Sequence, residues 1–243
     1  MAAPRFYCPG ILARSSTVEL PEPAAHHAAR VLRLKEGDAV TVFNGQGGEG
    51  AARITAIGKH STSVEIVAWH TVERESPLQV NLAQAISAGE KMDYTLQKAV
   101  ELGIGQIQPL ASERSVVRLS GERADKRVAH WQGVVIAACE QSGRNHVPEV
   151  APIRPLLDWL PQGGAGSLRL MLAPGAECGL HDLARPGGEV TLLIGPEGGL
   201  SPTEADAAKR IGFTPVRLGA RVLRTETAAL AALAAMQVLW GDF

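Results

Sequence analysis

Apolar and polar positions in the first third of the chain follow the two-residue period of half-buried β-strands. Runs rich in Val, Ile and Thr cover residues 39–43, 50–57 and 63–68, and polar stretches containing glycine separate them. Between residues 23 and 34 the spacing changes to that of a helix. One side of this helix would carry Ala24, Ala28, Val31 and Leu32. This part of the chain is therefore expected to be a small β-rich module.

A different pattern begins after the polar stretch at residues 71–77. Strands are predicted at residues 78–86, 104–110, 168–172, 190–194 and 215–218. Helices are predicted between them at residues 90–102, 123–141 and 203–211, and after the last strand at 225–239. Strands that alternate with helices imply a parallel sheet with helices on both faces. An α/β domain is therefore expected to follow the β-rich one.

The helix predicted at residues 225–239 is apolar nearly all the way round. Its sequence is rich in alanine and leucine and leaves no polar stripe, whereas a surface helix shows one apolar face only. This helix is therefore either a central core element or part of a subunit interface, and the sequence favours neither.

A glycine-rich elbow follows the strand predicted at residues 190–194. Gly195, Gly198 and Gly199 carry no Cβ, so backbone N–H groups there can approach a ligand closely. Ser201 and Glu204 then form the pattern of a capping box at the start of a helix, with a proline at its first position. Open α/β sheets bind ligands at such strand–loop–helix junctions.

Composition and charge restrict the class of protein. The chain has 243 residues, 45% of them hydrophobic, and a formal net charge of −1, which predicts a soluble globular protein and argues against one that coats nucleic acid non-specifically. Cys8, Cys139 and Cys178 lie far apart without ligand spacing, so we expect plain thiols and no metal site. No apolar run has the length of a membrane span and no signal peptide is recognisable, so a cytoplasmic location is expected.

Three loops at the predicted carboxyl ends of strands are the candidate site: residues 172–175, 195–199 and 218–227. No Walker lysine follows the elbow, and its Gly-Pro-Glu-Gly-Gly sequence does not match GxGxxG, which makes ATP and NAD poor candidates for this site. A small-ligand site and a tight structural turn both remain open. The histidines form no catalytic constellation, so acid or base chemistry would fall to carboxylates. The candidates are Glu197, Glu226, Glu113 and Glu140.

The sequence resembles a known family in these loops and in shorter motifs along nearly its whole length. The specific matches are residues 193–201 and 218–228. Further matches lie at residues 5–7, 26–27 with 31–33, 95–103, 112–115 and 139–145. In these segments the chain is similar to the bacterial small-subunit ribosomal RNA uridine N3-methyltransferases, members of the SPOUT class of knotted methyltransferases.

The resemblance implies a PUA-like RNA-binding β-barrel over residues 1–72 and a SPOUT methyltransferase domain with a C-terminal trefoil knot over 73–243. It also implies a homodimer, S-adenosylmethionine as methyl donor, and small-subunit ribosomal RNA as partner, either free or within the assembled 30S subunit. The residues that would bind the cofactor are Leu172, Ala173, Ile194, Gly195, Pro196, Gly198, Leu218, Gly219, Val222 and Leu223.

Methylation of uridine N3 sets a chemical requirement. N3 carries a proton and is a poor nucleophile until that proton leaves, so a base or a cation that stabilises the uridine anion is needed. Our hypothesis is that Arg224 or Arg144 stabilises this charge, while Glu197 or Glu140 accepts the proton or orients the arginine. The residues expected to contact RNA are Arg5, Arg30, Arg33 and Arg114.

Two alternatives stay open. The protein could bind RNA or assist ribosome assembly without catalysis, or it could be a knotted methyltransferase that acts on another RNA. The target nucleotide and the group that takes the proton are not fixed by the sequence.

Overall fold

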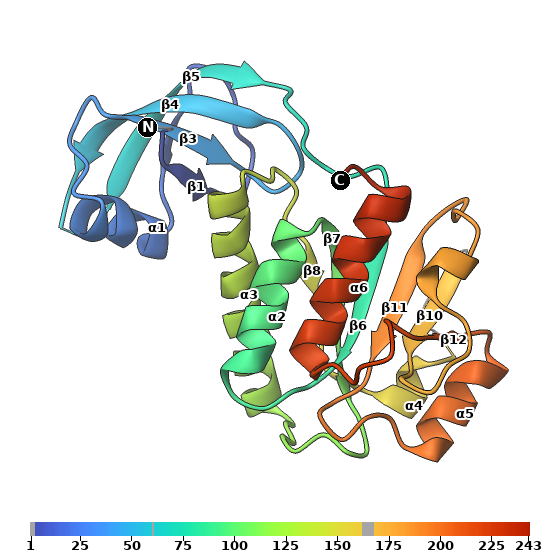
Figure 1. Ribbon diagram of the computed structural model, residues 1–243. Helices are drawn as coiled ribbons and strands as arrows, with labels where there is room; N and C mark the ends of the chain where they lie inside the picture. Colours follow the sequence, from blue (N-terminus) through green and yellow to red (C-terminus); the bar gives the residue numbers. More distant parts are fainter. Residues whose placement is uncertain (1–2, 60, 162–167) are drawn as a thin grey trace. The chain divides into compact units, whose positions relative to one another are not determined.

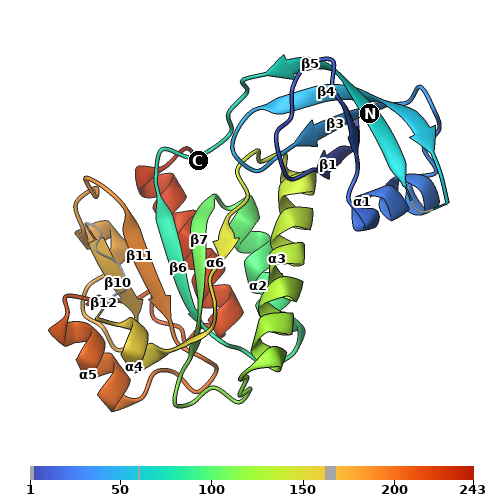
Figure 2. The ribbon, with the colours of Figure 1, turned by 180° about the vertical axis from the view of Figure 1, so that it is seen from behind.

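The computed structural model describes residues 3–59, 61–161 and 168–243, which divide into two compact units (Figures 1 and 2). The N-terminal unit consists of the chain up to Glu75 together with residues 136–147. The second unit consists of residues 76–135 and 148–243. One boundary falls inside the long helix α3 (Glu122–Ser142), where helical periodicity in the sequence gives no sign of a change of unit.

The N-terminal unit is built on a five-stranded sheet with the order β1-β3-β4-β5-β2. Its strands are β1 (Arg5–Tyr7), β2 (Thr17–Glu19), β3 (Ala39–Phe43), β4 (Glu49–Ile57) and β5 (Thr62–His70). β1 pairs with β3 in parallel, and the other neighbours are antiparallel. The core of this unit includes Phe6, Val42, Ile54, Val64 and Ile66, drawn from alternate positions of the strands. The β-rich module expected from the alternating pattern is confirmed.

The helix of this unit differs from its prediction. α1 (Glu22–His26) is only one turn long and continues as a π-helical turn over His27–Val31. A π-helical turn bonds each amide five residues back, as the Leu32 amide does to the His27 carbonyl at 3.0 Å, and the side chains then leave the α-helical face. Ala28 is buried as expected, whereas Val31 is exposed.

Polar contacts hold residues 136–147 against the rest of the N-terminal unit. The Glu140 carboxylate accepts the Tyr7 amide at 2.9 Å, and the Asn145 side-chain amide donates to the Val72 carbonyl at 2.8 Å. These contacts join positions far apart in the sequence, and a pattern of hydrophobic residues carries no signal for them.

The second unit is a parallel sheet with the strand order β12-β10-β11-β6-β7-β8, and β9 also pairs with β7. Its strands are β6 (Val80–Ala85), β7 (Ile104–Ala111), β8 (Glu149–Val150), β9 (Arg154–Pro155), β10 (Leu168–Leu172), β11 (Val190–Ile194) and β12 (Thr214–Val216). All five residues of β11 are buried, as the continuously apolar run predicts for a central parallel strand. The mixed α/β fold with a parallel sheet is thereby confirmed.

Helices cover both faces of this sheet. Besides part of α3, the unit contains α2 (Glu90–Glu101), α4 (Leu156–Trp159), α5 (Pro202–Arg210) and α6 (Thr225–Trp240). α2 and α6 pack against each other on one face, while α4 and α5 lie on the other (Figures 1 and 2). On the α4 and α5 side, Leu193 of β11 belongs to a core cluster with Trp159 and Phe213.

The apolar helix α6 has one side in the core and another at the surface. Ala229, Leu233 and Met236 are fully buried, but Val238 and Leu239 are 65% and 45% exposed. The expectation of a core element is therefore met by one side of the helix, and a subunit interface on the exposed side stays a prediction. In the described part of the chain, none of the helices combines the length and the hydropathy that a bilayer-crossing segment requires.

Candidate functional site

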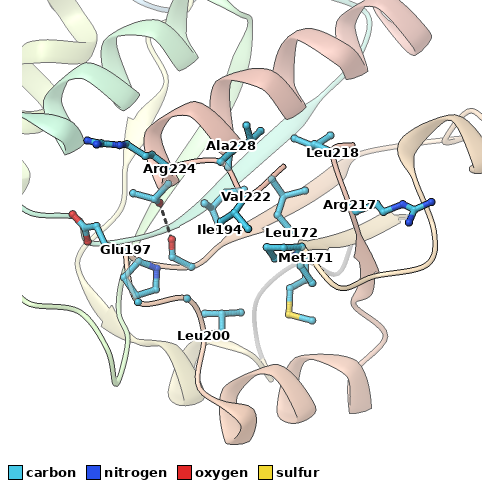
Figure 3. Close-up of a pocket in the computed structure, with 18 of the residues that line it drawn as sticks. Met171, Leu172, Ile194, Glu197, Leu200, Arg217, Leu218, Val222, Arg224 and Ala228 are labelled. Atoms are coloured by element: carbon cyan, nitrogen blue, oxygen red, sulfur yellow. Dashed lines mark hydrogen bonds between the residues drawn. The ribbon is translucent and has the colours of Figure 1, made fainter. Parts of the chain in front are cut away.

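A cavity of about 700 Å³ opens in the second unit at the carboxyl ends of β10, β11 and β12 (Figure 3). The three loops that follow these strands form most of its wall, as expected for ligand sites in open α/β sheets. The volume lies within the range of cavities that hold small molecules and cofactors. Leu172, Ile194, Leu218 and Val222 make its centre apolar.

The elbow after β11 is shaped by its own backbone. A Cβ on Gly195 would lie 2.9 Å from the Leu200 amide nitrogen, so only glycine lets the loop fold back at this point. Of the three glycines that the sequence marked, only Gly199 adopts positive φ, at 68°. The Gly199 amide closes the turn on the Pro196 carbonyl at 2.9 Å. The glycine at 195 thus serves the fold of the loop.

The helix that follows the elbow begins with the predicted capping box. The Ser201 hydroxyl accepts the Glu204 amide, and the Glu204 carboxylate accepts the Ser201 amide at 2.9 Å. The same buried carboxylate also accepts the Glu113 amide at 2.8 Å and the Ser112 hydroxyl at 3.1 Å. The loop after β7 is therefore attached to the elbow through Glu204.

Arg114 extends this attachment. Its guanidinium donates to the Gly198 carbonyl at 3.1 Å and to the Leu200 carbonyl at 3.4 Å. The sequence predicts RNA binding for this residue, which stays a prediction; in the structure its side chain also holds the elbow.

Thr225, at the start of α6, connects the elbow to the neighbouring strand. Its hydroxyl donates to the Gly195 carbonyl at 2.7 Å and accepts from the Gln84 side-chain amide at 3.0 Å. Gln84 belongs to β6, so this single hydroxyl joins β6, the elbow and the start of α6 around one end of the cavity.

Charged groups gather at one end of the cavity, where Figure 3 shows Glu197 and Arg224, with Arg217 at the opposite end. The Glu197 carboxylate accepts the Ala88 amide at 3.0 Å and the Lys91 ammonium at 3.1 Å. Burial alone would raise the pKa of Glu197, but the backbone amides of Ala88 and Glu197 and the Lys91 ammonium together outweigh it and lower the pKa below its ordinary value. A carboxylate with a lowered pKa is a weak base.

The residues predicted to hold the cofactor line this cavity with one exception. Gly219 belongs instead to a neighbouring hollow that also includes Val238 and Leu239 of α6. Several lining residues were missed by sequence reasoning. They include Lys91, Met171 and Arg217. Lys91 lies in the first turn of α2, over a hundred residues before Glu197, and no local motif connects the two.

The catalytic candidates divide between the units. Arg224 and Glu197 line the cavity, whereas Arg144 and Glu140 belong to the N-terminal unit. The Arg144 side chain is nearly buried and forms an ion pair with Glu75, with Nε 2.9 Å from the carboxylate. Burial raises the pKa of Glu140, and the Tyr7 amide opposes that shift.

The arginines expected to contact RNA also differ in their surroundings. Arg5 pairs with Glu49 at 2.5 Å and donates to the Asn145 side chain at 2.6 Å. Arg30 and Arg33 are exposed. Among the described residues, no group of three His, Cys, Asp or Glu side chains is arranged to hold a metal ion.

Comparison with known proteins identifies the family. Residues 74–237 match the model of an RNA methyltransferase domain, and residues 20–67 match that of an RNA methyltransferase PUA domain. Ribosomal RNA small subunit methyltransferase E of Buchnera aphidicola is 35% identical over 98% of this chain and 97% of its own length. The chain belongs to the ribosomal RNA small subunit methyltransferase E family.

Two solved structures related to this methyltransferase E family show a cofactor. The enzyme of that name from Neisseria gonorrhoeae, bound to S-adenosyl methionine, is 46% identical with a TM-score of 0.93. A methyltransferase structure from Legionella pneumophila with bound SAM is 40% identical with a TM-score of 0.95. Both alignments cover all of each chain. The PUA-domain match agrees with the RNA-binding type of module that the sequence resemblance implied for the N-terminal part.

Proposed function

We propose that this protein transfers a methyl group from S-adenosylmethionine to N3 of a uridine in small-subunit ribosomal RNA. The observation that carries the proposal is the cavity of about 700 Å³ at the strand ends, in a chain whose full-length relatives are solved with this cofactor. Methyl transfer to RNA follows from the family, and the choice of N3 follows from the sequence resemblance.

The residues present fit this cofactor. The apolar side chains of Leu172, Ile194 and Leu218 suit the flat adenosyl group, and the elbow supplies backbone donors and acceptors close to them. Nothing lies within 4 Å of the position a Cβ would take on Gly199, so the elbow is open there. When bound, the cofactor supplies an electrophilic methyl group for in-line attack.

The chain's own groups must prepare the uridine. Arg224 lies at the charged end of the cavity, where a guanidinium can stabilise the negative charge that develops on a uracil oxygen as N3 loses its proton. Glu197 accepts hydrogen bonds from the Ala88 amide and the Lys91 ammonium at this end, so Lys91 is the cation that it holds. Arg144 is already paired with Glu75, so the stabilising role falls to Arg224.

RNA contact is assigned to the exposed arginines of the N-terminal unit. Arg30 and Arg33 can reach a phosphate without breaking an internal ion pair, whereas Arg5 is engaged with Glu49. We propose domains at residues 1–72 for RNA binding and 73–243 for catalysis, as the sequence does, while residues 136–147 of the second range pack with the N-terminal unit.

We also propose a homodimer and a knotted C-terminal segment of the SPOUT class. The exposed apolar end of α6, at Val238 and Leu239, supports a second copy as its cover. The knot is proposed from the sequence resemblance alone.

The decisive experiment is methyl transfer from labelled cofactor to small-subunit ribosomal RNA, free and in assembled 30S subunits, with the modified nucleoside identified by mass spectrometry. We expect 3-methyluridine. A different methylated nucleoside would contradict the N3 assignment, and absence of transfer with tight cofactor binding would favour the non-catalytic alternative.

The role of Arg224 is tested by Arg224→Ala in single-turnover transfer. Loss of a charge-stabilising group typically slows the chemical step by about 100- to 1,000-fold. Cofactor affinity, measured by calorimetry, should change little. Arg210→Ala, an exposed arginine of α5, is the matched control. An unchanged chemical step in Arg224→Ala would remove Arg224 from the mechanism.

A further inference from the structure

The N-terminal unit contains a small hollow between α1 and the residues around the end of β4 and the start of β5, where Gly58, Lys59, Ser61 and Thr62 line it. Its volume is about 50 Å³. Pockets that hold drug-sized ligands have about 300–1,000 Å³, so this hollow is far too small to enclose a nucleoside. Its size therefore suits a single small polyatomic group.

The side chains around this hollow are mainly cationic. Arg30 and Lys59 line it and are exposed, and within the described residues neither forms an ion pair. His26 also lines it, and Glu22 is the one acidic side chain there. The hollow thus carries an excess of positive charge and favours an anion.

A buried hydroxyl points to the same kind of ligand. Thr62 lines the hollow, is only 1% exposed, and its Oγ1 has no hydrogen-bond partner in the part of the chain that the structure describes. An unpaired buried polar atom is costly and rare in native proteins, so it calls for a partner. A hydroxyl can donate to an anionic oxygen seated in the hollow.

We propose that this hollow binds one phosphate group of an RNA backbone, with Thr62 donating to a phosphate oxygen and Arg30 and Lys59 neutralising its charge. The inference rests on the proposed function in taking RNA as the partner. The hollow has room for a phosphate and not for a base, so it positions the strand without reading its sequence. Exposed Arg33, three residues beyond Arg30, extends the positive surface along the chain and favours a polymer over a free ion.

Thr62→Val separates a ligand contact from a structural role. Valine removes an unpaired buried hydroxyl, so thermal stability should stay the same or rise. Affinity for in vitro transcribed small-subunit ribosomal RNA should fall at least about tenfold, the loss typical of one hydrogen bond to a charged group. Thr55→Val, at an exposed position of β4, is the control and should leave affinity unchanged. Unchanged RNA affinity in Thr62→Val overturns the proposal.

Lys59→Ala tests the charge. The slope of log affinity against log salt should become shallower by about 0.7–0.9, the value for one lost phosphate contact. Lys35→Ala, an exposed lysine of the same unit that does not line the hollow, should not change it. Equal slopes for Lys59→Ala and wild type contradict the site.

Competition with inorganic phosphate distinguishes the two sources of the bound anion, an RNA backbone and free phosphate. We expect phosphate to compete only weakly with RNA, and Thr62→Val to reduce that competition. If inorganic phosphate binds the wild type while Thr62→Val and Lys59→Ala leave RNA affinity unchanged, the ligand is a free anion and the RNA assignment is wrong. If the two substitutions change RNA affinity and its salt slope as expected but the wild-type protein transfers no methyl group, the phosphate site is supported and the proposed function is contradicted.

Discussion

The Glu49 carboxylate connects several segments of the N-terminal unit. It pairs with Arg74 at 3.0 Å and with Arg5 at 2.5 Å. The hydrogen bond from Arg74, with Arg5 in support, outweighs the opposing effect of burial and lowers the pKa of Glu49 to about 2. Arg5 is in turn bonded to Asn145, so this carboxylate also helps to hold residues 136–147.

The lowered pKa predicts an acid-sensitive component of stability. A carboxyl whose folded pKa is depressed stabilises the fold fully above its unfolded pKa, here 4.5, and loses that contribution as the pH falls toward about 2. Glu49→Gln should therefore lower stability at neutral pH and flatten its decline between these two values. Urea unfolding at a series of pH values measures this. Glu65→Gln, at an exposed position of β5, is the control, and parallel curves for wild type and Glu49→Gln would contradict the prediction.

The chemistry of individual residues was predictable where it depended on neighbours in the sequence. The capping box at Ser201 and the apolar lining at Ile194 follow from short motifs. The partners of Arg5, Arg114 and Arg144 did not follow, because each of these side chains binds a group far away in the chain. A basic residue in a sequence gives the charge but not whether an internal acceptor already uses it.

At the scale of elements, the elbow after β11 is held from outside as well as by its own turn. The loop after β7 reaches it twice, through the Glu204 carboxylate and through the Arg114 guanidinium. Long strands and helices were predicted to within a few residues, since each shows several repeats of its period. The short strands β8 and β9 and the single turn α4 were not predicted, since two to four residues contain too little of any period.

Arg114→Ala tests whether this attachment serves the cofactor. Loss of a hydrogen bond from a charged donor costs about 1.5 kcal/mol, so S-adenosylmethionine should bind about tenfold more weakly by calorimetry. The salt dependence of RNA binding should stay the same. Arg118→Ala, exposed in the same loop, should leave cofactor affinity unchanged. Intact cofactor affinity with a shallower salt slope would instead support the RNA contact suggested by the sequence.

At the scale of the whole molecule, α6 carries apolar side chains both on its buried side and on its exposed side. The side toward the sheet is packed, and the far end exposes Val238 and Leu239 next to the apolar hollow that includes Gly219. The sequence indicated the excess of apolar residues but could not divide it between core and surface. That division depends on where α2 and the sheet meet the helix.

Val238→Asp should convert the proposed dimer to a monomer, because a buried unpaired carboxylate strongly opposes association. Sedimentation at micromolar concentration measures the change. Val67→Asp, an exposed valine of β5, is the matched control and should leave the dimer intact. A wild-type protein that sediments as a monomer would contradict the dimer itself.

The passage of residues 136–147 into the N-terminal unit has a consequence for protein engineering. The chain crosses between the two units at residues 75–76, 135–136 and 147–148, so no single cut separates them. A chimera that exchanges only the first 75 residues with a relative would leave Arg5 and Tyr7 of the donor facing the recipient's Asn145 and Glu140. Exchange of the whole N-terminal unit between relatives therefore requires both segments to be transplanted together.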